Sequence, residues 1–112
     1  MLLGGCIQIF SEDDCSDELV ESKVSDDGQF IANVVRRDCG ATTAPANIVY
    51  LKGRLESKEE DGPWGEKVYV LQGSESIPIH WEGQVVTLDV PAVGEKVFLA
   101  KKEWRGGLIR YD

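Results

Sequence analysis

Short apolar runs, each soon ended by glycine or by a polar turn, limit what this chain of 112 residues can fold into. No window longer than about ten residues keeps the spacing of an amphipathic helix. Val, Ile and Thr contribute 22 residues and the aromatic residues nine, whereas Ala contributes six. Branched and aromatic side chains fit a pleated sheet and form helices poorly. We therefore expect an all-β protein, and the length allows one such domain.

The alternation of apolar and polar residues predicts about eight short strands. The second of them, Gln29–Asp38, has apolar residues on both faces, which places it in the middle of a sheet. Short strands joined by hairpins indicate a small antiparallel β-sandwich or a twisted, barrel-like sheet of about seven or eight strands. The expected strands are Leu19–Val24, Gln29–Asp38, Asn47–Leu55, Lys67–Gln72, 77–82, 85–90, Lys96–Trp104 and Leu108–Tyr111.

Three connections can be predicted from turn residues. The Asp-Gly pair that ends at Gly28 favours the positive φ of a tight corner between the first two strands. Glu82-Gly83 is short enough to close a hairpin, and Gly106-Gly107 is expected to close the last one. Pro78 lacks a backbone donor, so its strand is expected at a sheet edge or beside a bulge.

The chain is acidic, and its negative charge is concentrated at the front. The formal net charge is −8, and residues 1–35 hold eight acids and one Lys. Such a chain is repelled by phosphate backbones, so we expect no nucleic-acid partner. The cluster Glu12–Glu18 is interpreted as a solvated tether, because its spacing does not match a calcium loop. Residues 1–17 are therefore expected to precede a single β domain at 18–112, with no metal and no cofactor.

The three cysteines bear on the compartment. Cys15 and Cys39 are far enough apart to join the acidic front of the chain to the end of the long second strand. A bridge of that size would stabilise the fold by about 3 kcal/mol. It would also place the chain in an oxidising compartment outside the cytosol. The alternative is a pair of buried thiols in a cytosolic protein.

Cys6 has a different setting. Met1–Cys6 (Met-Leu-Leu-Gly-Gly-Cys) is similar to the end of a bacterial lipoprotein signal, in which the cysteine carries the lipid. Only five residues precede Cys6, fewer than the apolar stretch of such a signal needs. The alternative is an exposed tail with an incidental cysteine. If Cys6 is lipidated, that anchor is the only expected membrane contact, and Ile7 after it implies the outer membrane.

One segment is distinctive: Arg36-Arg37-Asp38-Cys39-Gly40-Ala41-Thr42-Thr43. Together with Ser25–Ala32 and Ile79–Trp81, it resembles a family of small bacterial envelope proteins built on a domain of unknown function. That family pairs a Ser-Pro-Asp-Gly turn with a Cys-Gly-Ala-Thr-Thr segment, and Asp26 stands here in place of the Pro. The resemblance covers about residues 24–90 and implies an envelope address, in the periplasm or at the outer membrane, without implying a reaction.

The same segment supplies the candidate binding residues. Charged and hydroxyl side chains at the end of a strand could engage an anionic group or the edge of a partner. The alternative is structural, because small residues and threonines also suit a tight chain reversal. The candidate residues are Arg36, Arg37, Asp38, Thr42 and Thr43.

Catalysis has little support in the sequence. His80 is the only histidine, and its strand pattern predicts an outward position. Trp64, Trp81 and Trp104 are expected to pack in the core or across strands. We therefore expect a non-enzymatic envelope protein that recognises another envelope or secreted protein, for instance by edge pairing. The alternative is a small periplasmic hydrolase or ligand-binding domain that uses His80 with nearby carboxylates or Arg36.

Overall fold

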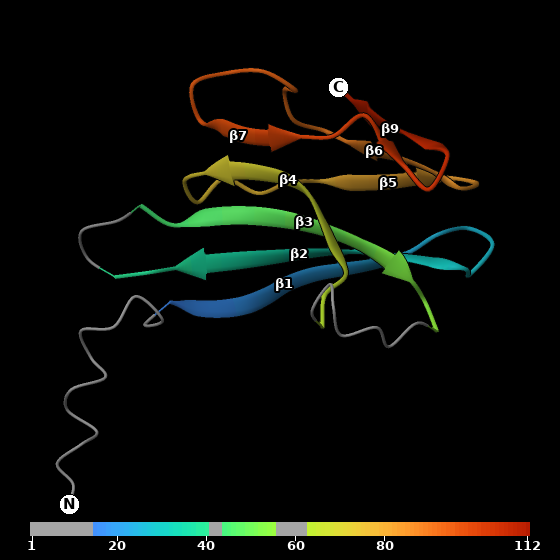
Figure 1. The fold of residues 1–112 in the computed structure, drawn as a ribbon, viewed down its shortest axis with the longest axis horizontal. Helices are drawn as coiled ribbons and strands as arrows, with labels where there is room; N and C mark the ends of the chain where they lie inside the picture. Colours follow the sequence, from blue (N-terminus) through green and yellow to red (C-terminus); the bar gives the residue numbers. More distant parts are fainter. Residues whose placement is uncertain (1–14, 41–43, 56–62) are drawn as a thin grey trace, which may run out of the picture.

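The computed structural model describes residues 15–40, 44–55 and 63–112, and these residues form an all-β sandwich of two sheets (Figure 1). This confirms the predicted fold class. None of the described residues belongs to a helix that could cross a membrane. In chain order, the strands are β1 (Ser16–Val24), β2 (Phe30–Asp38), β3 (Ala46–Gly53), β4 (Glu66–Gln72), β5 (Ile79–Glu82), β6 (Val85–Leu88), β7 (Val97–Ala100), β8 (Glu103–Trp104) and β9 (Gly107–Tyr111).

The larger sheet has the order β1-β2-β3-β4-β7, and every neighbouring pair in it is antiparallel. Figure 1 shows β1 to β4 side by side in sequence order. β2 lies between β1 and β3, as its two apolar faces predicted. The register aligns an apolar side chain from each strand in one row: Leu19, Val35, Ile48, Val70 and Leu99.

The smaller sheet has the order β5-β6-β9-β8. β5 and β6 form the predicted hairpin, and Gly83 takes a φ of 64° at its corner. β5 is at the sheet edge, directly after Pro78, as the missing backbone donor required. β6 and β9 pair in parallel, so one neighbour in this sheet is reached by a long connection instead of a hairpin.

The prediction of one strand over Lys96–Trp104 is wrong. The chain leaves the larger sheet after Lys101, whose backbone N–H still donates to Val68 of β4. The carbonyl of the next residue, Lys102, accepts from Ile109 of β9. The segment is thus divided between β7 in one sheet and β8 in the other, and only β8 forms a hairpin with β9.

Several strand ends also differ from prediction. β1 begins at Ser16, so Asp17 and Glu18 are strand residues and not part of a tether. β3 ends at Gly53, two residues early, because the chain turns at Arg54 and Leu55. β6 ends at Leu88, two residues early, because the chain turns there and the Val90 N–H donates to the Leu88 carbonyl.

The main core lies between the two sheets. Tyr69, Leu51, Ile79 and Leu88 are among its fully buried side chains, and Trp104 closes one end of it. A second, smaller cluster covers the other face of the larger sheet. It consists of Val35, Ile48 and Tyr50, with Trp64 and Val70 packed against it. All three tryptophans therefore pack against apolar neighbours, as expected.

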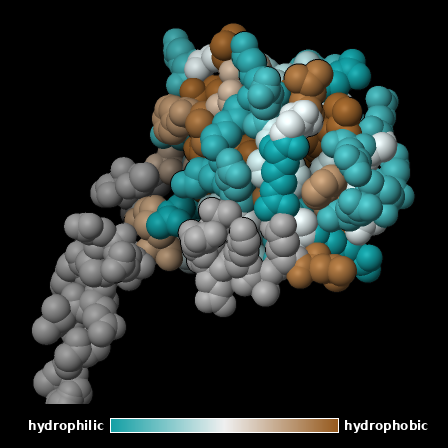
Figure 2. All heavy atoms as spheres, turned by 45° about the vertical axis from the view of Figure 1, so that its right-hand side comes forward, coloured by the Kyte–Doolittle hydropathy of each residue, from teal (hydrophilic) through white to brown (hydrophobic). Residues whose placement is uncertain are grey.

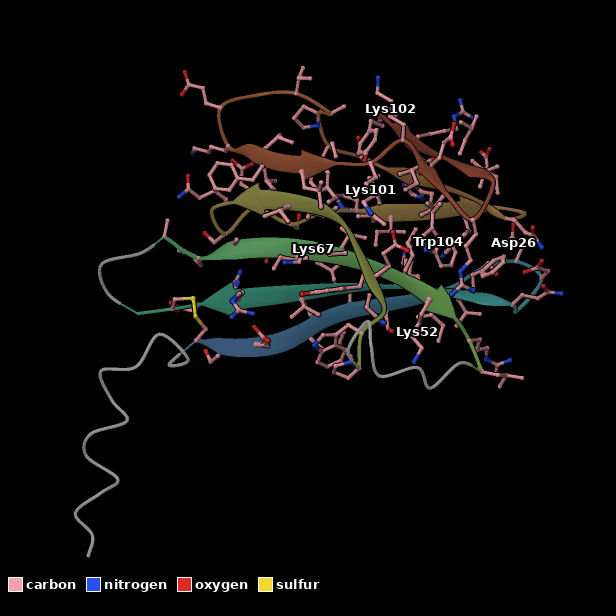
Figure 3. The ribbon with its side chains drawn as sticks, in the orientation of Figure 1. Asp26, Lys52, Lys67, Lys101, Lys102 and Trp104 are labelled. Atoms are coloured by element: carbon pink, nitrogen blue, oxygen red, sulfur yellow. A yellow bond between two sulfur atoms is a disulfide. The ribbon has the colours of Figure 1, made fainter. Side chains whose placement is uncertain are left out.

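Cys15 and Cys39 form a disulfide, with an S–S distance of 2.03 Å. The predicted pairing is confirmed, and the alternative of two free thiols at these positions is wrong. The bridge joins the start of β1 to the end of β2, where Ser16 and Asp38 face each other in register. Figure 3 shows it at the opposite end of the molecule from Trp104. Cys6 and the rest of residues 1–14 lie outside the described residues.

Candidate functional site

The charged residues predicted as a binding loop all have local partners. Arg37 forms an ion pair of 3.6 Å with Asp17, its cross-strand neighbour on β1. Arg36 donates from Nη2 to the carbonyl of Ser74 at 3.4 Å, although its buried Nε has no acceptor. The Asp38 carboxylate accepts from the Gly40 N–H at 3.1 Å. Thr42 and Thr43 lie outside the described residues, so the structure brings together only part of the proposed loop.

His80 lies exposed on β5, where it faces Thr87 of β6 in register. The described residues contain no group of three or more His, Cys, Asp or Glu side chains arranged to hold a metal ion. Neither of the two hollows described below includes His80 or Arg36. The hydrolase alternative at this histidine stays a prediction.

An acidic turn ties the two sheets together. Asp26, in the β1–β2 turn, accepts from the Gly83 N–H at 2.9 Å. Its neighbour Asp27 accepts from Gln84 Nε2 at 2.6 Å and from Ser25 Oγ at 2.7 Å. The bonds from Ser25, Gln84 and the Gln29 N–H favour the carboxylate and lower the pKa of Asp27. The sequence identified this turn but gave no sign of its partner in the β5–β6 turn.

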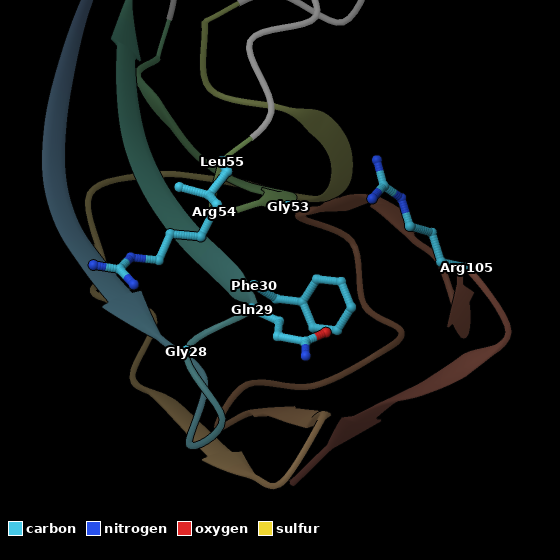
Figure 4. A pocket seen from close by; sticks show the side chains of 7 residues that line it. All are labelled: Gly28, Gln29, Phe30, Gly53, Arg54, Leu55 and Arg105. Carbon is cyan, nitrogen blue, oxygen red and sulfur yellow. The ribbon is translucent and has the colours of Figure 1, made fainter.

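Beside these turns, the sandwich is open at one end. The larger of two adjoining hollows there measures about 490 Å³ and contains Phe30 from β2, Arg54 and Leu55 after β3, and Arg105 from the β8–β9 turn (Figure 4). The smaller measures about 130 Å³ and shares Phe30 and Arg105 with it. We call the two hollows together the end groove. The remaining lining residues are Gly28, Gln29, Gly53, Gln84, Trp104, Gly106 and Gly107.

The floor of the end groove is aromatic. The Phe30 ring meets the Trp104 ring edge to face, with centroids 5.2 Å apart, and stacks on Trp81 at 6.4 Å. The Arg105 guanidinium lies 4.6 Å from the centre of the Trp104 ring. Leu55 is 92% exposed at the rim. Figure 2, which turns this end forward, shows apolar atoms between hydrophilic side chains. The sequence signals for this groove were weak, because its residues come from four separate segments.

The second candidate surface is the outer edge of the larger sheet. β1 is an edge strand of nine residues, and all but one of them are exposed. Leu19 and Val20 are 43% and 52% exposed, although both are apolar. The register shifts between Leu19 and Glu21, which makes Val20 a bulge. β1 therefore forms a long edge, and the backbone groups on its side away from β2 can form hydrogen bonds with another strand.

The far end of this edge is already covered by β5. The indole N–H of Trp81 donates to the Lys23 carbonyl at 3.0 Å, and Lys23 Nζ donates to the Ile79 carbonyl at 3.1 Å. Backbone groups alternate in direction along a strand. At the start of β2, the Phe30 carbonyl accepts from Ser25 on the β1 side, whereas the Gln29 carbonyl accepts from Arg54 on the β3 side, so Val35 faces β3 as Gln29 does. Leu19, the partner of Val35 on β1, therefore directs its backbone groups to the open edge.

Comparisons of the chain with protein-family models, with curated proteins and with solved structures found no match.

Proposed function

We propose that this chain is a non-catalytic recognition domain of the bacterial cell envelope, which binds an extended, basic segment of another envelope or secreted protein. The observation that carries the proposal is the exposed edge of β1 over residues 16–22. An extended segment can add to such an edge as a further strand, with main-chain hydrogen bonds giving affinity. The envelope address is supported by the Cys15–Cys39 bridge, since disulfides persist outside the cytosol.

Charge favours a basic partner over a second copy of this chain. Residues 16–22 carry Asp17, Glu18 and Glu21 and no base. Two such edges brought together would place six carboxylates along one seam, in a dimer of two chains that each carry a formal charge of −8. Like charges facing each other across strands are destabilising. The same acids attract an extended segment rich in Lys or Arg.

Two peptides of equal length test this proposal, one alternating Lys with Val and the other Glu with Val. We expect the Lys peptide to slow amide hydrogen exchange in residues 16–22 and the Glu peptide to leave it unchanged. Leu19→Pro removes a donor from the open edge without breaking a bond to β2, so this variant should fold and lose the protection. Glu18→Gln should weaken binding by about two- to threefold. Equal binding of both peptides, or unchanged binding by Leu19→Pro, would contradict edge recognition.

The compartment has its own test. We expect a thiol-reactive polyethylene glycol maleimide to leave Cys15 and Cys39 unmodified in protein taken from cells, and to label both after reduction. Fractionation of the same cells should place the chain with the envelope. Labelling of both thiols without reductant, or recovery in the cytosol, would contradict the envelope address while leaving the edge proposal to be judged by the peptides.

A further inference from the structure

The end groove has three features that its role in packing does not explain, and the first is the backbone of Arg105. Arg105 has a φ of 53° and is the only residue other than glycine with a positive φ in the described part of the chain. With Gly106 at 82°, it forms the two-residue corner between β8 and β9. Asn, Asp and Gly suit such a corner, whereas other residues cost roughly 1 kcal/mol there. Asn would form the turn more readily, so the arginine contributes something other than the turn.

That contribution is a cation at the mouth of the groove. The strained backbone carries the guanidinium over the Trp104 ring and beside both hollows. Backbone strain of this kind is retained where surrounding structure compensates for it, and it is concentrated at binding sites.

The second feature is a buried donor without an acceptor. Trp104 is 8% exposed and lines the smaller hollow, and its Nε1 has no hydrogen-bond partner. Leaving a buried N–H unsatisfied costs about 1–3 kcal/mol. The indole of Trp81, by contrast, donates to a backbone carbonyl. An acceptor atom of a ligand in the smaller hollow would satisfy the Trp104 donor after a small adjustment of its neighbours.

The third feature is a second arginine on the opposite rim. Arg54 follows β3, and its Nη1 lies 3.8 Å from the position that a β-carbon on Gly28 would occupy. Figure 4 shows Arg54 and Arg105 on opposite sides of the groove, with Phe30 between them. Among the described residues, the carboxylates of Asp26 and Asp27 in the β1–β2 turn are bonded to the β5–β6 turn, at Gly83 and at Gln84. A chain of net charge −8 thus places two cations around an apolar floor.

From these three features we propose that the end groove binds an amphiphilic organic anion, with an apolar or aromatic body and a carboxylate. The body would lie on Phe30 and against Leu55, where the larger hollow of about 490 Å³ has the size of a small-molecule site. The carboxylate would bind the Arg105 guanidinium, whose paired donors match two carboxylate oxygens. Arg54 would attract the anion from the opposite rim. This site is separate from the β1 edge, and neither proposal depends on the other.

The probe for this site is naphthalene-2-acetate, with the neutral naphthalene-2-acetamide as its matched control. The three indole N–H signals of ¹⁵N-labelled protein, assigned with Trp→Phe variants, report where each compound binds. We expect the acetate to shift the Trp104 signal in a saturable way and to leave that of Trp64, on the far face of the larger sheet, in place. The amide should bind at least about tenfold more weakly, because it is neutral and cannot form an ion pair with a guanidinium.

Arg105→Asn separates binding from folding. It keeps a residue suited to the positive φ, so the melting temperature should stay the same or rise. The affinity for the acetate should fall by about tenfold or more, since the charged hydrogen bonds are lost. Arg54→Gln should weaken binding by about two- to fivefold. Arg110→Gln, at an exposed position of β9 outside the groove, should change nothing. Equal affinities for acetate and amide, or full affinity in a folded Arg105→Asn variant, would overturn the proposal.

Discussion

Two tyrosines in the main core pair with carbonyls of the chain segments that close it. Tyr69 donates to the Pro91 carbonyl at 2.8 Å, and Tyr111 donates to the Lys101 carbonyl at 2.6 Å. Their rings lie 5.6 Å apart. Burial raises the pKa of Tyr111 to about 12, and the neighbouring Tyr69 adds to the shift. Burial also raises the pKa of Tyr69, with a smaller contribution from Glu75.

Stability should therefore fall in strong base. In the unfolded chain, tyrosine ionises near pH 10, whereas the folded chain keeps Tyr111 neutral to about pH 12. The stabilisation is fully present below about pH 10 and is lost as the pH rises towards 12. Urea unfolding at about pH 8 and about pH 11 measures the difference. Tyr111→Phe should show a smaller drop between the two pH values, and an equal drop would contradict this assignment.

Gly65, which precedes β4, is required by both its backbone and its surroundings. Its φ is 112°, and a β-carbon there would lie 2.8 Å from Cβ of Lys52 and would also meet the Leu51 carbonyl. Gly73 has a similar φ of 114°, but a β-carbon there would meet nothing within 4 Å. The two glycines form a matched pair that separates backbone strain from steric overlap.

We expect Gly73→Ala to lower the free energy of unfolding by about 1 kcal/mol, through backbone strain alone. Gly65→Ala should cost about 1–3 kcal/mol more, because the overlap must be relieved by moving β3. Denaturant midpoints of the two variants check this, and equal losses would show that the chain relaxes around Gly65.

Among the elements, β1 depends most on a covalent link. It is an edge strand with one neighbour, and the Cys15–Cys39 bridge fixes its start to the end of β2. Replacing both cysteines by serine should lower the free energy of unfolding by about 3 kcal/mol, the entropy of closing a loop of this size. Urea unfolding with and without reductant checks this. The double variant should be insensitive to reductant, and an unchanged midpoint in the reduced wild type would contradict a stabilising role.

Strand prediction worked where turn chemistry marks a corner and failed where a strand changes sheets. The Gly28 and Gly83 corners were predicted, because φ values of 79° and 64° there favour glycine. The division of Lys96–Trp104 was not predicted. Apolar residues stand on both sides of Lys101 and Lys102, and no glycine or proline marks the point where the chain crosses between the sheets. Which sheet a segment joins depends on distant partners, Val68 and Ile109 in this case.

The same limit applies to the candidate sites. Arg36, Arg37 and Asp38 form a conspicuous local motif. In the structure their side chains form an ion pair and hydrogen bonds with other residues of the same chain. The end groove is assembled from residues far apart in the chain, and Arg105 among them belongs to no motif. The disulfide could be predicted from the sequence, because Cys15 and Cys39 are far enough apart to bridge two segments and Cys6 has a different setting. A site defined by the meeting of four segments could not be found in that way.

At the scale of the whole molecule, one core joins both sheets, so we expect them to unfold together. Ile109 of β9 is 5% exposed and faces this core, whereas its neighbour Leu108 is 58% exposed. Ile109→Ala should cost about 2–4 kcal/mol, and Leu108→Ala should cost less than about 0.5 kcal/mol. Circular dichroism and tryptophan fluorescence should report one shared transition for each variant. Two separate transitions after Ile109→Ala would show that the larger sheet stands on its own.

The position of β9 has a consequence for how this protein is made. Because β9 lies between β6 and β8, these two strands cannot join one sheet until residues 107–111 are available. A nascent chain on the ribosome can form the β5–β6 hairpin but cannot complete the smaller sheet. An isolated hairpin is marginal in water. Such a chain stays loosely folded until β9 emerges and completes the sandwich.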